Sequence, residues 1–303
     1  MTATFAAPTD LEEALALLAQ DQAARPVAGG TDLVVAARQG RKPLPESIVA
    51  IDRIAELGGH EVVDGSLLLG ALTDHAWLAG SPDVRASWTA LADAASIVGS
   101  PATRGTGTIG GNLINASPAA ETIAPLVVFD AQVTLRGSGG AERTVAAADL
   151  ATGPGRTVAT QGELLTRVSV PAMAAGSGSA YIRLEYRRAM EIAIVGAAAL
   201  VTIAGGVVHE ARIALTAVAP TIVRAPEAEA VLRGSPATRA SFLDAGRAAA
   251  AAARPIDDVR ASADYRRAML EVVVARVLAA AAGRAAGEQI PVPASRWAHG
   301  QEI

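Results

Sequence analysis

The amino-acid sequence predicts an α+β protein made of three successive units and a short tail. Hydrophobic residues make up 51% of its 303 residues, which is enough to bury more than one compact core. Strand-like runs and helical repeats are mixed along the chain up to about residue 171. Beyond them, three strand patterns are followed by alanine-rich helical segments, an order typical of an α+β domain.

We assign residues 1–57 to a first, small β–α unit. Leucines at helical spacing follow Thr9, which stands three residues before Glu12 as in a capping box. Strand-like runs at residues 25–28 and 47–51 enclose a second helical pattern.

Residues 58–173 form the second predicted unit, which is α+β. Asp-Gly at residues 64–65 and a glycine-rich turn at residues 137–140 each indicate a hairpin. Between them, residues 88–98 carry apolar side chains at helical spacing, and Gly99 supplies a stop for that helix.

The third predicted unit is a C-terminal α+β domain over residues 178–286. A Gly/Ala/Ser linker at residues 172–179 leads into it. We expect a three-stranded antiparallel sheet with helices, its strands at residues 181–186, 193–203 and 207–218. Two prolines in the tail, residues 287–303, predict an extended conformation there.

Composition excludes several functional classes. The 26 basic and 30 acidic residues are scattered, so no nucleic-acid surface or membrane arm is expected. There is no cysteine, which excludes an iron–sulfur cluster held by this chain, and the four histidines are too far apart to suggest a metal site. Glu12 and Glu13 interrupt the first apolar stretch before a signal peptide can form. Charges within residues 269–286 favour an amphipathic helix over a membrane span, so we expect a soluble, cytoplasmic protein.

Two glycine clusters are the strongest functional signal. The first, residues 28–32 (Ala-Gly-Gly-Thr-Asp), follows a strand and precedes a helix, a pattern that suits a phosphate. The second, residues 106–112 (Thr-Gly-Thr-Ile-Gly-Gly-Asn), offers the Thr108 and Asn112 side chains beside small residues. Each alone is compatible with a tight structural turn, and neither is a Walker A or Rossmann motif. Together they predict a nucleotide-like ligand whose diphosphate lies between two subdomains.

These clusters resemble the two FAD-binding signatures of a known family. Residues 26–33 (Pro-Val-Ala-Gly-Gly-Thr-Asp-Leu), 107–113 (Gly-Thr-Ile-Gly-Gly-Asn-Leu) and 115–121 (Asn-Ala-Ser-Pro-Ala-Ala-Glu) are similar to the medium, flavoprotein subunits of molybdenum hydroxylases. Aerobic carbon monoxide dehydrogenases and bacterial xanthine dehydrogenases belong to this family. The resemblance covers nearly the whole chain. It implies a two-subdomain FAD-binding fold of the vanillyl-alcohol-oxidase/PCMH type, followed by the family's C-terminal domain.

The resemblance also implies roles for individual residues. The implied cofactor-binding residues are Val27, Ala28, Gly29, Gly30, Thr31, Asp32, Gly99, Thr108, Gly110, Gly111, Asn112, Glu121, Leu165 and Arg183. The family usually has aspartate at Glu121, where it binds the nucleotide part of FAD, and often lysine at Arg183, near the flavin ring. Glu191 and Ile192 are implied to lie close to the isoalloxazine. Ile192 resembles the xanthine enzymes, because the carbon monoxide enzymes have tyrosine there.

The implied function is that of an oxidoreductase subunit that transfers electrons and has no catalytic side chain of its own. FAD in this chain would take electrons from two [2Fe-2S] clusters in a small partner and pass them to NAD⁺, quinone or oxygen. A large partner would hold molybdenum–molybdopterin and bind the substrate, and the family usually forms a dimer of heterotrimers. Two alternatives stay open: a stand-alone FAD-dependent oxidase of the related fold, and a subunit that has lost flavin.

Some charged residues also have a plainer interpretation. Without the resemblance, Arg187 and Arg188 would be solvated charges at a strand end. The run Tyr265, Arg266 and Arg267 is expected on a helix surface that could face a partner chain.

Overall fold

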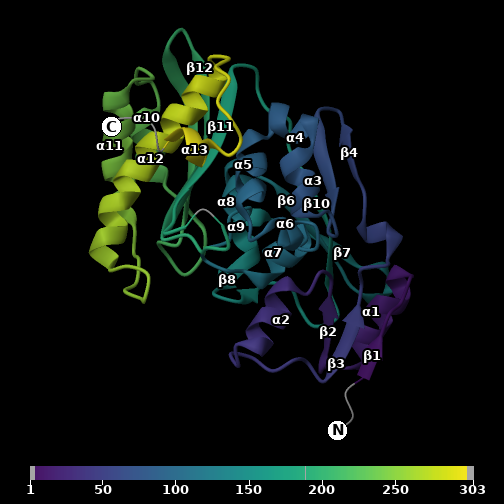
Figure 1. Cartoon of the computed structure of the whole chain (residues 1–303). Helices are drawn as coiled ribbons and strands as arrows, with labels where there is room; N and C mark the ends of the chain where they lie inside the picture. The colour runs from purple at the N-terminus through teal and green to yellow at the C-terminus, as the bar shows by residue number, and fades with distance from the viewer. Residues whose placement is uncertain (1–3, 188, 299–303) are drawn as a thin grey trace.

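The computed structural model describes residues 4–187 and 189–298, and it is an α+β protein as predicted. Figure 1 shows three parts: an N-terminal part in purple, a middle part in blue and teal, and a C-terminal part in green and yellow. Each part has its own sheet. The proposed divisions of the chain after residues 57, 173 and 286 stay predictions.

The N-terminal part is a parallel βαβαβ unit whose three-stranded sheet has the order β1-β3-β2. Its elements are β1 (Thr4–Ala6), α1 (Leu11–Gln20), β2 (Ala24–Val27), α2 (Thr31–Arg38) and β3 (Ser47–Ala50). The predicted N-cap of α1 is wrong by one residue. Asp10, not Thr9, caps the helix, because its side chain accepts from the Glu13 N–H at 3.0 Å.

The middle part contains a five-stranded antiparallel sheet of order β4-β5-β10-β6-β7. Its strands are β4 (His60–Val63), β5 (Ser66–Gly70), β6 (Gln132–Arg136), β7 (Glu142–Ala146) and β10 (Leu164–Val170), with β8 (Ala151–Gly153) and β9 (Arg156–Thr157) forming a separate small pair. Both predicted hairpins are confirmed, as β4–β5 and β6–β7.

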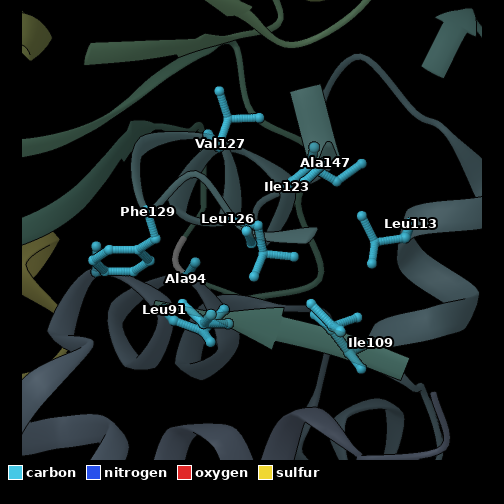
Figure 2. Packing of buried hydrophobic residues seen from close by; sticks show 14 of the residues in the cluster. Leu91, Ala94, Ile109, Leu113, Ile123, Leu126, Val127, Phe129 and Ala147 are labelled. Atoms are coloured by element: carbon cyan, nitrogen blue, oxygen red, sulfur yellow. The ribbon is translucent and has the colours of Figure 1, made fainter. Parts of the chain in front are cut away.

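Short helices fill the connections of the middle part. They are η1 (Ala55–Leu57), α3 (His75–Gly80), α4 (Pro82–Ser87), α5 (Thr89–Ile97), α6 (Pro101–Arg104), α7 (Ile109–Asn115), α8 (Ile123–Val128), η2 (Ser138–Gly140) and α9 (Ala147–Leu150). The predicted helix before Gly99 is confirmed as α5. Figure 2 shows Leu91 of α5, Leu113 of α7 and Leu126 of α8, which belong to one core cluster of this part.

The C-terminal part has four antiparallel strands, not the three predicted. The elements are β11 (Ser177–Leu184), β12 (Val195–Ala204), β13 (Val207–Thr216), β14 (Val223–Arg224), α10 (Pro226–Leu232), α11 (Arg239–Ala252), α12 (Ala263–Ala285) and α13 (Ala294–Ala298). The extra strand β14 is only two residues long and pairs with Leu215 and Ala214 at the sheet edge, so it leaves no periodic signal in the sequence.

Two further expectations for the C-terminal part are wrong. Ser177, Gly178 and Ser179 belong to strand β11 and not to a linker, because they pair with β12. The tail is not wholly extended, since residues 294–298 form α13. The Ala294 N–H donates to buried Asp93 at 2.9 Å, which fixes the start of this short helix. Residues 299–303 lie outside the described part of the chain.

The C-terminal sheet is covered on both faces. Helix α12 packs on β11 and β12, and α11 packs on α12. The opposite face lies against α5 and α8 of the middle part, where Tyr181 and Leu200 join the same core cluster as Leu91. This arrangement brings the strand that carries Arg183 against the middle part. Over the described residues, no helix is both long enough and apolar enough to cross a membrane.

Candidate functional site

The two glycine clusters predicted from the sequence meet in the structure. A Cβ atom added to Gly29 would overlap the carbonyl oxygen of Thr106, so only glycine permits this backbone contact. A Cβ on Gly107 would lie 3.4 Å from the Thr31 hydroxyl. The first loop (residues 28–32) and the second loop (residues 105–112) therefore form one surface.

The first loop ends at an open helix terminus. Gly30 caps α2 in a left-handed conformation, with φ of 64°, and makes no side-chain capping hydrogen bond. The first N–H groups of α2 have no acceptor within their own helix, and the positive end of the helix dipole lies there. Asp32 is exposed but has protein atoms crowded around it, and this partial desolvation raises the pKa of its carboxyl while Arg41 opposes the shift.

The second loop is held by hydrogen bonds within the protein. The N–H of Gly107 donates to the Thr103 carbonyl at 2.7 Å, and that of Gly110 donates to the Ala71 carbonyl at 2.9 Å. Thr108 caps α7, since its hydroxyl accepts from the Gly111 N–H at 3.1 Å. The two loops thus differ. The first ends at helix N–H groups that have no acceptor within their helix, whereas the second consists of small residues held in place by hydrogen bonds within the protein.

Asn112 connects the second loop to Glu121. Its side-chain oxygen accepts from the Thr122 hydroxyl at 2.7 Å, which places Glu121 beside α7. Glu121 forms an ion pair with Arg183, so two residues that the sequence suggested separately act on each other. Burial raises the pKa of the Glu121 carboxyl, while the Arg183 guanidinium opposes this shift.

The loop between β11 and β12, residues 185–194, approaches the middle part. The Met190 N–H donates to the Gly99 carbonyl at 3.3 Å, so the loop containing Glu191 and Ile192 lies next to Gly99. Glu191 pairs with Arg187 at 3.2 Å, and 43% of Ile192 is exposed. Arg188 lies outside the described residues.

Other candidates lie at varying distances from the loops. Val27 ends β2 and runs directly into the first loop, where its carbonyl accepts from the Ile51 N–H at 2.9 Å. Leu165 is buried in strand β10, within the core of the middle part. Arg266 is not on a helix surface as expected: it is 3% exposed and donates to the Ile194 and Ala217 carbonyls.

Sequence reasoning missed several residues of this region. Glu185, which directly follows β11, forms a second ion pair with Arg183, and its position two residues after Arg183 was a signal for it. Met190 and the buried His75, beside Gly107, carried no such signal, because their contacts are with distant parts of the chain.

No other feature of the described residues competes with this site. None of their His, Asp and Glu side chains gather in a group of three that could hold a metal ion. A cavity of about 540 Å³ lies between α4 and residues 284–292, but it is lined by no residue of the two glycine loops.

Two glycine loops in contact beside an open helix N-terminus are typical of proteins that bind a nucleotide cofactor. Comparison with known families narrows this class. Residues 1–173 match the family described as "FAD binding domain in molybdopterin dehydrogenase", and residues 180–281 match "CO dehydrogenase flavoprotein C-terminal domain".

Individual proteins resemble the chain over almost its full length. It is 36% identical to the carbon monoxide dehydrogenase medium chain of Hydrogenophaga pseudoflava over 93% of this chain and 98% of that one. It is 28% identical to a putative xanthine dehydrogenase FAD-binding subunit of Escherichia coli (strain K12), over 94% and 98%. A solved carbon monoxide dehydrogenase structure from H. pseudoflava superimposes with a TM-score of 0.89 at 36% identity, covering 94% and 98% of the two chains.

The chain therefore belongs to the FAD-binding medium subunits of the molybdenum hydroxylases, the carbon monoxide dehydrogenase and xanthine dehydrogenase family. It is the oxidoreductase FAD subunit of a molybdenum hydroxylase complex, and a medium chain implies a small and a large partner subunit. This confirms the resemblance and the fold class predicted from the sequence.

Proposed function

We propose that FAD binds where the two glycine loops meet, and that the contact between Gly29 and Thr106 beside the open N-terminus of α2 is the observation that carries this assignment. The residues fit the cofactor. Unshielded N–H groups at a helix N-terminus suit a diphosphate, and glycines let it approach the backbone. Residues 27–32 would hold the diphosphate, with Thr108, Gly110, Gly111 and Asn112 forming the opposite wall.

The remaining candidates would surround the cofactor on either side of its diphosphate. Glu121 would accept a hydrogen bond from FAD, and Gly99, Glu191 and Ile192 would border the ring. Leu165 would contribute only apolar packing from within the core. The side chain of Ile192 would shield one side of the site from water, while the pairing of Glu191 with Arg187 would fix the loop that carries them.

When bound, FAD would supply the redox chemistry, by which electrons from two [2Fe-2S] clusters of the small partner would pass to NAD⁺, quinone or oxygen. The absence of cysteine supports placing these clusters in another chain. The proposal includes molybdenum–molybdopterin and the substrate pocket in the large partner, a dimer of heterotrimers, and a cytoplasmic location. A stand-alone oxidase is disfavoured because the match to the medium chain of H. pseudoflava covers 98% of that chain.

The first test is to purify the tagged chain from its native host under mild conditions. We expect about one FAD per chain on denaturation, together with a cysteine-rich iron–sulfur protein and a large molybdenum protein. Anaerobically reduced complex mixed separately with NAD⁺, a quinone or oxygen would identify the acceptor. An intact complex without flavin would contradict the proposal, and FAD on a lone chain would favour the oxidase.

A matched pair of variants tests the site itself. Gly29→Ala would push the first loop away from Thr106 and should remove most of the FAD from the complex. Gly80→Ala is the control, because a Cβ there would have no atom within 4 Å. Full FAD content in Gly29→Ala would exclude the junction of the loops as the binding site.

A further inference from the structure

A buried cluster of three charged residues lies where the C-terminal sheet meets the middle part. The Arg183 guanidinium donates to the Glu121 carboxylate through Nη1 and to the Glu185 carboxylate through Nε. Arg183 lies near the end of β11, and Glu185 follows directly after the strand, so the two residues are two positions apart at the strand end. Tyr181, on the same face of β11 as Arg183, packs in the core of the middle part.

The side chains of Arg183 and Glu121 differ in their accessibility to a ligand. The Arg183 side chain is 0% exposed, so a ligand in the site cannot contact it. The Glu121 side chain is 11% exposed and is attached to α7 through the hydrogen bond between Thr122 and Asn112. The ion pair with Arg183 uses Oε1 of Glu121, so the second carboxylate oxygen is not engaged by that pair.

We propose that Arg183 is a positioning residue that aims the Glu121 carboxylate at the cofactor and makes no cofactor contact of its own. This inference rests on the proposed FAD site and gives Arg183 an indirect role in place of the direct one that the family resemblance implied. Glu185 takes part by holding the guanidinium from the other side, so that the fork of Arg183 is fixed between two carboxylates.

The pairing explains why arginine suits this chain. A guanidinium offers several donors in a fixed plane and can bind both carboxylates at once, whereas an ammonium is a point charge. Glu121 and Arg183 also belong to different parts of the molecule, the segment before α8 and strand β11. The ion pair therefore makes the position of Glu121 in the middle part depend on strand β11 of the C-terminal part.

Three variants of the intact complex test whether Arg183 positions Glu121: Glu121→Gln, Arg183→Lys and the double variant. Glu121→Gln should raise the FAD dissociation constant about tenfold or more, the effect of losing a charge-assisted hydrogen bond. Arg183→Lys keeps the buried charge but loses the fork, so it should weaken FAD binding several-fold and shift the flavin reduction potential. Because both residues act through one carboxylate, the double variant should bind FAD no more weakly than Glu121→Gln.

Arg224→Lys is the matched control, because Arg224 also pairs with a buried glutamate, Glu229, at 2.6 Å but belongs to β14, outside the site. It should lower the melting temperature without changing FAD affinity or potential. An Arg183→Lys complex with wild-type FAD affinity and potential would overturn the inference, and so would additive effects in the double variant. A wild-type complex without FAD would instead overturn the proposed function itself.

Discussion

His75 illustrates how burial at a single residue creates a pH dependence. It is 2% exposed at the start of α3, and its Nδ1 has no hydrogen-bond partner among the described residues. Burial lowers the pKa of His75 to about 4, with Arg104 acting in the same direction and Asp74 opposing. The folded protein therefore holds this imidazole neutral beside the second glycine loop.

The sign of the effect on stability follows from the lowered pKa. In the unfolded chain His75 takes up a proton below about pH 6.5, but in the folded protein only below about pH 4. Stability from neutral His75 is thus complete above pH 6.5 and is lost as the pH falls toward 4, by at most about 1.4 kcal/mol per pH unit. We expect His75→Gln to flatten the decline of the melting temperature over this range.

The exposed His209 provides the control for this prediction. His209→Gln should follow the wild-type curve of melting temperature against pH. If His75→Gln also runs parallel to the wild type between pH 6.5 and 4, His75 does not carry the pH dependence.

At the residue scale, the sequence predicted what depends on neighbours in the chain. The two glycine loops were identified because their spacing is local, and the structure places them in contact. The ion pair between Glu121 and Arg183 was not predicted, since the two residues are 62 positions apart and meet only after the sheet has packed. Arg266 was expected on a surface for the same reason: its acceptors, Ile194 and Ala217, are distant in sequence.

At the scale of elements, the contact between β11 and α12 depends on one glycine. A Cβ on Gly178 would overlap the backbone of α12 at Ala281 and Ala285. The strand and the helix can therefore lie closer together here than any side chain would allow. This explains why a residue that resembles linker composition is part of a buried strand.

Gly178→Ala should separate the strand from the helix and destabilise the protein. Overpacking at a buried contact costs about 1–3 kcal/mol, and backbone atoms cannot move aside as side chains can. We expect a lower melting temperature and a lower yield of soluble protein. Gly80→Ala should leave stability unchanged or slightly higher, because Gly80 is exposed at the end of a helix. Equal melting temperatures for both variants would refute the close-contact interpretation.

Elements with a strong local pattern were predicted well, and short elements were not. Both hairpins and α5 follow from turn residues and apolar spacing. Strand β14 and helix α13 have two and five residues, too few for any period to show. Strand β14 is fixed by its pairing with Ala214 and Leu215 at the end of β13, and α13 by Asp93, which lies far along the chain.

At the scale of the whole molecule, Asp93 joins the middle part to the C-terminal part. This carboxylate is 0% exposed on α5 and accepts from both Nη atoms of Arg284, at 2.6 and 3.0 Å. It also accepts from the N–H groups of Tyr181, at 3.0 Å, and Ala294, at 2.9 Å. One side chain thereby connects α5 with β11, α12 and the tail, which lie together in Figure 1.

Removing this carboxylate should loosen the tail before it unfolds the molecule. Asp93→Ala leaves the Arg284 guanidinium buried without its charge partner, a loss that typically costs about 3–5 kcal/mol. The tail also loses the acceptor that begins α13. We expect a lower melting temperature and faster trypsin cleavage at Arg284 and Arg296 under native conditions.

Asp244→Ala removes an exposed ion pair with Arg247 and should change stability by less than about 0.5 kcal/mol. If Asp93→Ala left tail cleavage at the wild-type rate, the tail would be held by its apolar contacts with the core, through Ile290 and Ala298, and not by this carboxylate.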